Sequence, residues 1–261
     1  MIKFFRHIRK SLIEKNQMGK YFKYAIGEIL LVMVGILLAL QVNNWNENRK
    51  AKTFEENMLS EIYETLNSDI EIFGRFEERI RNKDSAIDNL LYARAGKKEF
   101  TNAELKDDVF WAGASILFSY NDGPYEALKS SGLDKIRTDS LRYRLTDYYE
   151  VYLPRAISFI QDTHDEYEPP INKMINRFRE DGFFEEYLEL IVEDSIEKGY
   201  APRTKYNIDK YLTEPYYEEY LILNAHYKSE LWWMLKSIIS RSKQIREAVK
   251  QELKERFNHD L

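Results

Sequence analysis

The chain of 261 residues is 44% hydrophobic and 32% charged, and it contains 10 glycines, 6 prolines and no cysteine. The lack of cysteine excludes disulfides and thiolate-bound zinc or iron–sulfur sites, and the scarcity of glycine and proline favours long helices joined by few turns. Residues 1–42 hold seven basic and two acidic residues, a net charge of +5. Residues 43–261 hold 32 basic and 42 acidic residues, a net charge of −10. This acidic main part is unsuited to binding nucleic acid.

The first segment, residues 1–23, is basic and amphipathic. Lysines and arginines lie between apolar residues that recur at spacings of three and four: Ile2, Phe5, Ile8 and Leu12. This pattern predicts a cytoplasmic helix that lies on the membrane with its cations near anionic lipid. A basic tail without regular structure, which only sets the membrane topology, fits the same residues equally well.

Residues 24–46 are predicted to form a transmembrane helix, with the lipid bilayer as partner. From Ala25 to Val42 the chain has 18 residues with one ionisable group, Glu28. A helix of that length spans roughly 27 Å, close to the ~30 Å hydrocarbon core of a bilayer. Aromatic residues that favour the headgroup region stand at both ends: Tyr21, Phe22, Tyr24 and Trp45. The basic residues before the span are expected to stay cytoplasmic, which sends residues 47–261 across the membrane as a helical domain.

Glu28 is the residue of the span that needs an explanation, because a carboxylate in hydrocarbon is costly. On a helix it shares a stripe with Gly35 and Ala39, a pair of small residues that permits close packing of another helix. One hypothesis is that Glu28 faces a partner helix, in a homo-oligomer or in another membrane protein, and couples the anchor to it. The alternative is that Glu28 lies one turn inside the interface and reaches water near Lys23.

The N-terminal residues also carry a resemblance to a known family. The resemblance is carried by KYFKYAIGEI at residues 20–29 and ALQVNNWNE at residues 39–47. Weaker matches are YEALKSSG at residues 125–132 and DSLR at residues 139–142. On these residues the chain resembles a family of uncharacterised single-pass inner-membrane proteins of Gram-negative bacteria, a domain of unknown function. The resemblance implies a bacterial inner membrane, a cytoplasmic N-terminus and a periplasmic helical domain. It implies no activity and no catalytic residues.

Residues 47–95 are predicted to form one long helix. Its apolar residues recur at spacings of three, four and seven, which is typical of one buried helix face: Phe54, Met58, Ile62, Leu66, Ile70, Phe73, Phe76, Ile80, Ile87 and Leu91. The helix would be roughly 70 Å long. Residues 43–48 contain no helix breaker, so this helix is expected to continue directly from the transmembrane helix.

Shorter helices are predicted in the middle of the chain. The capping-box pattern from Thr101 to Glu104 starts a helix that is expected to reach about Phe118. Pro124 opens a short helix that Gly132 ends. Thr138 or Asp139 caps the next helix, which Pro154 kinks or restarts and which continues to Pro169-Pro170. Residues 171–213 are expected to be shorter helices and loops, broken at Gly182, Gly199 and Pro202.

A final long helix is predicted from Thr213. Its buried side is expected to hold Leu221, Leu231, Leu235, Ile238, Ser242, Ile245, Val249 and Leu253. Two long helices with shorter ones between them predict an all-α fold, in which one N-terminal transmembrane helix is followed by an elongated antiparallel helical bundle.

The sequence offers little evidence for catalysis. None of the four histidines lies in a metal-binding spacing, and no phosphate-binding loop or nucleophile elbow occurs. We therefore expect no catalytic residues, no metal and no cofactor, and a protein that is not an enzyme. The acidic residues around His164 are more typical of a solvated helix end than of a cation site.

Binding is the more plausible role. Tyrosines cluster at residues 143–152 and 216–227, where they either line a pocket or form a boundary layer between core and water. If the bundle has a functional loop, the segment Tyr120–Asp134 is the one favoured, with Tyr125, Glu126 and Lys129 as binding residues. The alternative, which the residues favour over it, is that this segment is a structural cap at the distal end of the bundle. The leading hypothesis is an oligomeric envelope protein that binds a protein partner or small ligand. The alternative is an accessory subunit of an inner-membrane complex, coupled through Glu28.

Overall fold

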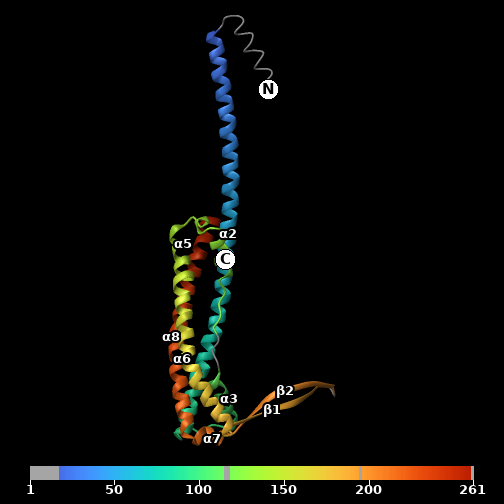
Figure 1. Ribbon diagram of the computed structural model, residues 1–261, viewed down its shortest axis with the longest axis vertical. Helices are drawn as coiled ribbons and strands as arrows, with labels where there is room; N and C mark the ends of the chain where they lie inside the picture. The colour runs from blue at the N-terminus through green and yellow to red at the C-terminus, as the bar shows by residue number, and fades with distance from the viewer. Residues whose placement is uncertain (1–17, 115–117, 194–195, 260–261) are drawn as a thin grey trace. The chain divides into compact units, whose positions relative to one another are not determined.

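The computed structural model describes residues 18–114, 118–193 and 196–259 (Figure 1). The chain divides into two compact units, Met1–Asn57 and Met58–Leu261. Most of the predicted basic amphipathic segment, residues 1–17, lies outside the described residues.

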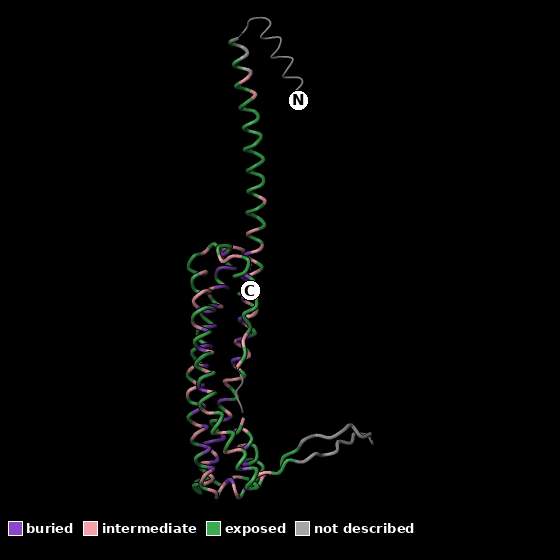
Figure 2. Tube along the Cα trace, viewed as in Figure 1, coloured by how far each residue is buried: buried purple, intermediate pink, exposed green. Residues whose placement is uncertain are grey.

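The first unit contains the N-terminal part of helix α2, Met18–Arg94. An 18-residue window of this helix has a mean hydropathy of 2.4 and no buried residue, and Figure 2 shows this stretch as exposed. Within the described part of the chain, it is the helix that is long and apolar enough to cross a membrane. The helix also runs without a break through residues 43–48, as the absence of a breaker there predicts.

The second unit is built around the C-terminal part of α2, helix α6 (Leu153–Glu180) and helix α8 (Pro215–Phe257). Side-chain contacts between α2 and α8 run in opposite chain directions, since Glu77 pairs with Lys236 and Asn67 with Arg246. The α6–α8 contacts are also antiparallel, because Thr163 bonds to Glu230 and Phe178 contacts Tyr217. The predicted antiparallel bundle is therefore present.

The bundle core follows the predicted stripe on α8 fully and the predicted stripe on α2 in part. All eight positions predicted for the inner side of α8 are buried. On α2 the buried apolar residues are Leu59, Ile62, Leu66, Phe73, Ile80, Ala86, Ile87 and Leu90. Five of these were predicted, whereas Leu59, Ala86 and Leu90 were not, and the other five predicted positions are half-buried: Phe54, Met58, Ile70, Phe76 and Leu91. The ionisable residues Asp69 and Lys83, which lie on the same buried face, were also not predicted.

Three short helices follow α2: α3 (Asn102–Gly113), α4 (Gly123–Ser131) and α5 (Asp139–Thr146), with the 3₁₀ turn η1 (Leu133–Lys135) before α5. The capping box at Thr101 is confirmed, because Glu104 N–H donates to the Thr101 hydroxyl oxygen and the Glu104 carboxylate accepts from Thr101 N–H. The prediction that this helix reaches Phe118 is wrong. It ends at Gly113, the poorest helix former in the segment apart from proline, and Ala114 is already extended.

The connection from α5 to α6 is a π-helix, η2 (Asp147–Tyr152), which buries the adjacent residues Tyr148 and Tyr149. Helix α6 then restarts with Pro154 in its first turn, as predicted. The prediction that this helix ends at Pro169-Pro170 is wrong, since α6 passes through both prolines to Glu180. The prolines remove two N–H donors, but residues 165 and 166, whose carbonyls lose those partners, are exposed to water.

Residues 184–206 form an antiparallel hairpin of β1 (Phe184–Glu193) and β2 (Ile196–Tyr206) instead of the predicted helices and loops. Gly199 and Pro202 are typical helix breakers, yet both fit a two-stranded sheet in which each strand is an edge. The register pairs Phe184 with Tyr206 at the base of the hairpin. Short helix α7 (Ile208–Thr213) leads into α8.

Candidate functional site

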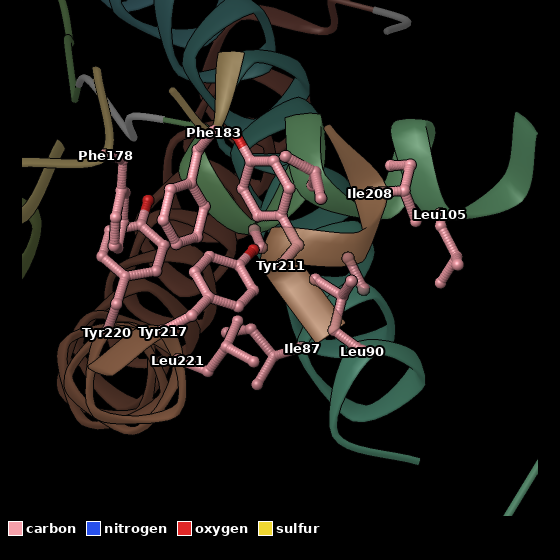
Figure 3. Close-up of a cluster of buried hydrophobic side chains, with 13 residues drawn as sticks. Ile87, Leu90, Leu105, Phe178, Phe183, Ile208, Tyr211, Tyr217, Tyr220 and Leu221 are labelled. Atoms are coloured by element: carbon pink, nitrogen blue, oxygen red, sulfur yellow. The ribbon is translucent and has the colours of Figure 1, made fainter. Parts of the chain in front are cut away.

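Aromatic side chains meet where α6 ends and α8 begins. Phe178 of α6 lies 4.8 Å from Phe183, 5.5 Å from Tyr217 and 5.1 Å from Tyr220, measured between ring centres. Tyr211 of α7 lies 5.0 Å from Phe183 and 4.9 Å from Tyr217. Figure 3 shows these five rings facing one another, and we refer to them as the aromatic cluster.

A tight turn after α6 brings Phe183 into the aromatic cluster. Gly182 has φ +69°, a left-handed conformation that glycine adopts without strain. The Phe183 N–H then donates to the Phe178 carbonyl at 2.9 Å, and the Asn207 N–H donates to the Phe183 carbonyl at 2.7 Å. These two backbone bonds fix Phe183, which is fully buried, between the helix and the base of the hairpin.

Arg94, the last residue of α2, holds the other side of the cluster. Its guanidinium donates to the Tyr211 carbonyl at 2.6 Å and to the Glu214 carbonyl at 3.0 Å. The same group lies 6.0 Å from the ring centre of Tyr217, within cation–π range. Arg94 therefore fixes the α7–α8 connection, and with it the position of the cluster, against α2.

An open pocket of about 260 Å³ lies beside the cluster. It is lined by Val109, Phe110, Gly113, Ala114, Ile175, Phe178, Arg179, Phe184, Glu186, Thr204, Tyr206, Tyr211, Tyr217 and Tyr220. Half of these residues are aromatic, and of these Phe110 is exposed and Phe184 and Tyr206 are half-buried. The pocket shares four lining residues with a larger and more polar groove of about 890 Å³ at the base of the hairpin: Arg179, Phe184, Glu186 and Tyr206.

The interior of this aromatic pocket is electrically neutral. Burial raises the pKa of Tyr211, Tyr217 and Tyr220 above the ordinary phenol value, so all three hydroxyls keep their protons at neutral pH. The charged lining residues, Arg179 and Glu186, form a pair at 3.6 Å, and both side chains are more than half exposed. Ring faces with a few neutral hydroxyls and one ion pair at the rim are suited to holding a ligand.

The predicted binding residues Tyr125, Glu126 and Lys129 do come together, on α4. The Tyr125 hydroxyl donates to Glu150 of η2 at 2.7 Å, and Lys129 lies 3.3 Å from Glu150 and 3.6 Å from Glu126. However, the Tyr125 side chain is 1% exposed and stacks on Tyr149 at 4.5 Å. The cluster therefore joins α4 to η2, and none of the three residues lines the aromatic pocket.

The predicted packing residues of the span lie in the first unit on α2. Glu28 is half-buried, whereas Gly35 and Ala39 are exposed. A Cβ atom placed on Gly35 would meet nothing within 4 Å. The surface at Gly35 and Ala39 is thus open to another helix, and the role of all three residues stays a prediction.

In the second unit, the sequence did not predict two ionisable side chains on the buried face of α2. Lys83 is 1% exposed and donates to the carbonyl oxygens of Ala112 at 2.6 Å and Ala114 at 3.2 Å. Burial lowers its pKa to about 7. Asp69 is 3% exposed and accepts from the Asn121 N–H, and burial raises its pKa to about 6. A signal existed, because each residue interrupts an apolar stripe at helical spacing.

His164 does not belong to a metal site in the part of the chain that the structure describes. Its Nδ1 lies 2.9 Å from the Tyr227 hydroxyl and its Nε2 lies 2.9 Å from Glu168. Nearby, the Tyr167 hydroxyl donates to Glu230 at 2.9 Å. No group of three or more ligating side chains occurs among the described residues. The contacts with Tyr227 and Glu230 join α6 to α8, and the contact with Glu168 lies within α6.

Comparison with known proteins gives one match. A family model described as a family of unknown function, DUF6090, matches residues 28–197, which is well over half of the chain. No curated protein and no solved structure matches. The match extends from Glu28 on α2 to the start of β2, so α7 and α8 lie beyond it.

Proposed function

The chain belongs to DUF6090, a family of unknown function, and we propose that it is a membrane-anchored protein that binds a small ligand in the aromatic pocket. In this proposal the span holds the protein in the inner membrane of a Gram-negative bacterium, and the bundle lies in the periplasm. The pocket is the observation that carries the binding role.

The exposed apolar surface of α2 supports the anchor. From Leu30 to Leu38 every large apolar side chain is about half exposed or more. Water-exposed apolar surface is unfavourable by roughly 25 cal/mol per Å². Hydrocarbon removes that cost, and a helix also satisfies its own backbone hydrogen bonds there.

The charge around the span supports the orientation. Residues 1–42 carry a net charge of +5, and the basic residues precede the span. Cytoplasmic flanks of transmembrane helices are enriched in Lys and Arg, which favours a cytoplasmic N-terminus. The acidic bundle then lies on the opposite side.

Membrane fractionation of the full chain tests the anchor. Wild type is expected in the membrane pellet after an alkaline carbonate wash, and a periplasm-dependent reporter fused after Leu261 is expected to be active. The double variant Val34→Arg/Leu37→Arg should leave the pellet, because each arginine costs about 2.5–3.5 kcal/mol at the centre of a span. The matched variant Val34→Ala/Leu37→Ala should stay. A reporter active only in the cytosol contradicts the orientation.

The composition of the pocket wall supports ligand binding. Ligand sites are typically concave, lined mainly by aromatic and apolar side chains, and equipped with a few polar groups. The aromatic pocket has that composition, and its position is fixed by Arg94 and by the turn at Gly182. A rigid wall reduces the entropy lost on binding.

Co-purification tests the binding role. The full chain in mild detergent is compared with Gly113→Leu, whose new side chain enters the pocket, and with Gly74→Leu as control. A Cβ placed on Gly113 would lie 3.3 Å from the Tyr220 hydroxyl oxygen, whereas one on Gly74 would meet nothing within 4 Å. Mass spectrometry should find a small molecule with wild type and Gly74→Leu that is depleted in Gly113→Leu. Identical profiles for all three proteins would contradict the role.

A further inference from the structure

The volume of the aromatic pocket limits the ligand to a small ring system. A cavity of roughly 150 Å³ in another protein holds benzene. At about 260 Å³, the pocket is larger than that but lies below the range of most drug-sized sites. One ring or two fused rings fit these dimensions.

The charges of the pocket favour a ligand without net charge. The exposed ring of Phe110 and the half-buried rings of Phe184 and Tyr206 offer surface for stacking, and the protonated Tyr220 hydroxyl is a neutral donor. Arg179 and Glu186 at the rim already pair with each other, so an ion of either sign meets an equal charge that repels it. A charged ligand would also lose its hydration against an apolar wall.

The pocket wall offers one hydrogen-bonding group beside Gly113 of α3, which has no side chain. The Tyr220 hydroxyl oxygen lies 3.3 Å from the position that a Cβ on Gly113 would occupy. Both residues line the pocket, so this hydroxyl stands at its surface rather than behind another side chain. A ligand beside Gly113 is therefore within reach of one hydrogen bond.

We propose that the pocket binds a neutral, flat aromatic compound of one or two fused rings with a single hydrogen-bonding group, held by stacking on the rings of Phe110, Phe184 and Tyr206 and by the Tyr220 hydroxyl. This proposal rests on the proposed binding role and specifies its ligand class. In this proposal the pocket prefers flat, uncharged rings over charged ligands.

Titration of the intact protein with a matched set of probes tests the proposal. The probes are indole, its 3-carboxylate as the anion, tryptamine as the cation, and cyclohexanol as a neutral ring without π electrons. Ligand-observed NMR measures binding to wild type, Gly113→Leu and Gly74→Leu in the same detergent. Because partition into micelles is common to all three samples, the difference between variants reports on the pocket.

Indole is expected to bind wild type and Gly74→Leu at least about tenfold more tightly than Gly113→Leu, and at least about tenfold more tightly than either charged analogue. Tyr220→Phe, which keeps the ring, should weaken indole binding by roughly 3- to 10-fold, the loss of one hydrogen bond. This second variant keeps the test decisive if Gly113→Leu fails to fold.

Other outcomes separate the ligand class from the binding role. A charged analogue or cyclohexanol that binds wild type at least as tightly as indole, and is lost in Gly113→Leu, overturns the ligand class and leaves the binding role standing. If no probe distinguishes wild type from Gly113→Leu and the co-purification profiles are also identical, the pocket is not a binding site and both proposals fail.

Discussion

The ammonium group of Lys83 lies 2.6 Å from the carbonyl oxygen of Ala112, inside the bundle and at the end of α3. The last carbonyls of a helix have no partner within the helix, and the terminal nitrogen of Lys83 donates a hydrogen bond to one of them. Lys83 therefore supplies the C-terminal cap that ends α3 at Gly113. The cap places an ionisable group in the core, which makes the stability of the bundle depend on pH.

Lys83 should raise the free energy of unfolding at alkaline pH. Its pKa is about 7 in the folded chain and 10.5 when unfolded, so the contribution is complete above 10.5 and is lost as the pH falls through 7. Between about pH 7.5 and 9.5, the difference between wild type and Lys83→Met should change by roughly 1.4 kcal/mol per pH unit. Chemical denaturation of the full chain in detergent measures this difference.

The exposed Lys236, which pairs with Glu77, provides the control for this experiment. Lys236→Met should show no such change relative to wild type. Parallel pH profiles for wild type and Lys83→Met would mean that Lys83 keeps an ordinary pKa.

Asp69 should have the opposite effect at acidic pH. Its pKa is raised to about 6 from 3.8, so its contribution is complete below 3.8 and is lost as the pH rises through 6. Asp69→Asn keeps an oxygen that accepts from the Asn121 N–H and carries no charge. The variant should therefore be more stable than wild type at pH 7, by about 1–3 kcal/mol, and equally stable near pH 4.

Denaturation at the two pH values measures this difference. Asp122→Asn, a change at the neighbouring exposed carboxylate, is the control and should shift stability much less. An Asp69→Asn variant that is less stable than wild type at pH 7 would contradict the expected direction.

Both groups illustrate what the sequence could and could not predict. The stripe on α8 was predictable because each of its turns places an apolar residue at the expected spacing. Asp69 stands between Leu66 and Phe73 on α2, so its burial could have been read from the same spacing. Its hydrogen bond with Asn121 could not be predicted, because the two residues are 52 positions apart in the sequence and meet only in the folded chain.

The aromatic pocket was predictable only in part. Tyr217 and Tyr220 stand out in the sequence as members of a tyrosine cluster. Phe178 of α6 and the hairpin residues Phe184 and Tyr206, which complete the aromatic lining, come from a segment predicted as helices and loops. Strand pairing depends on contacts that a local pattern does not contain.

Tyr125→Phe should weaken the junction between α4 and η2. The change keeps the buried ring and its stack on Tyr149 but removes the hydroxyl that donates to Glu150. We expect a loss of about 1–2 kcal/mol in the free energy of unfolding at pH 7. The exposed Tyr143 provides the control, and Tyr143→Phe should leave stability unchanged.

The same variant should change how Glu150 titrates. The Tyr125 hydroxyl and the Lys129 ammonium hold the pKa of Glu150 below its ordinary value. This contribution is present above pH 4.5 and is lost as the pH falls through the folded-state pKa. The stability gap between wild type and Tyr125→Phe should therefore narrow below pH 4.5, and a gap that widens there would contradict the contact.

Glu28→Gln separates a simple anchor from a coupling subunit. Because a neutral amide costs less in hydrocarbon than a carboxylate, the variant should stay in the membrane pellet at wild-type levels. If the protein acts as an anchored binding protein, the pattern of co-purified membrane proteins should also stay the same. Selective loss of a co-purified protein would instead favour the accessory-subunit hypothesis. Glu47→Gln, beyond the span, is the matched control.

The π-helix η2 holds one residue more than a regular helix would. Buried residues fall at Leu141, Leu145, Tyr149, Leu153 and Ala156, three steps of four followed by one of three, and the steps of four would drift around an α-helix. Removing one residue inside η2 restores alternating steps of four and three and leaves the inward side of α6 in phase with α5. A chain shortened by one residue there would thus keep its bundle intact while presenting one inward tyrosine in place of two. Such a chain would separate the contribution of the stack on Tyr125 from that of the surrounding helices.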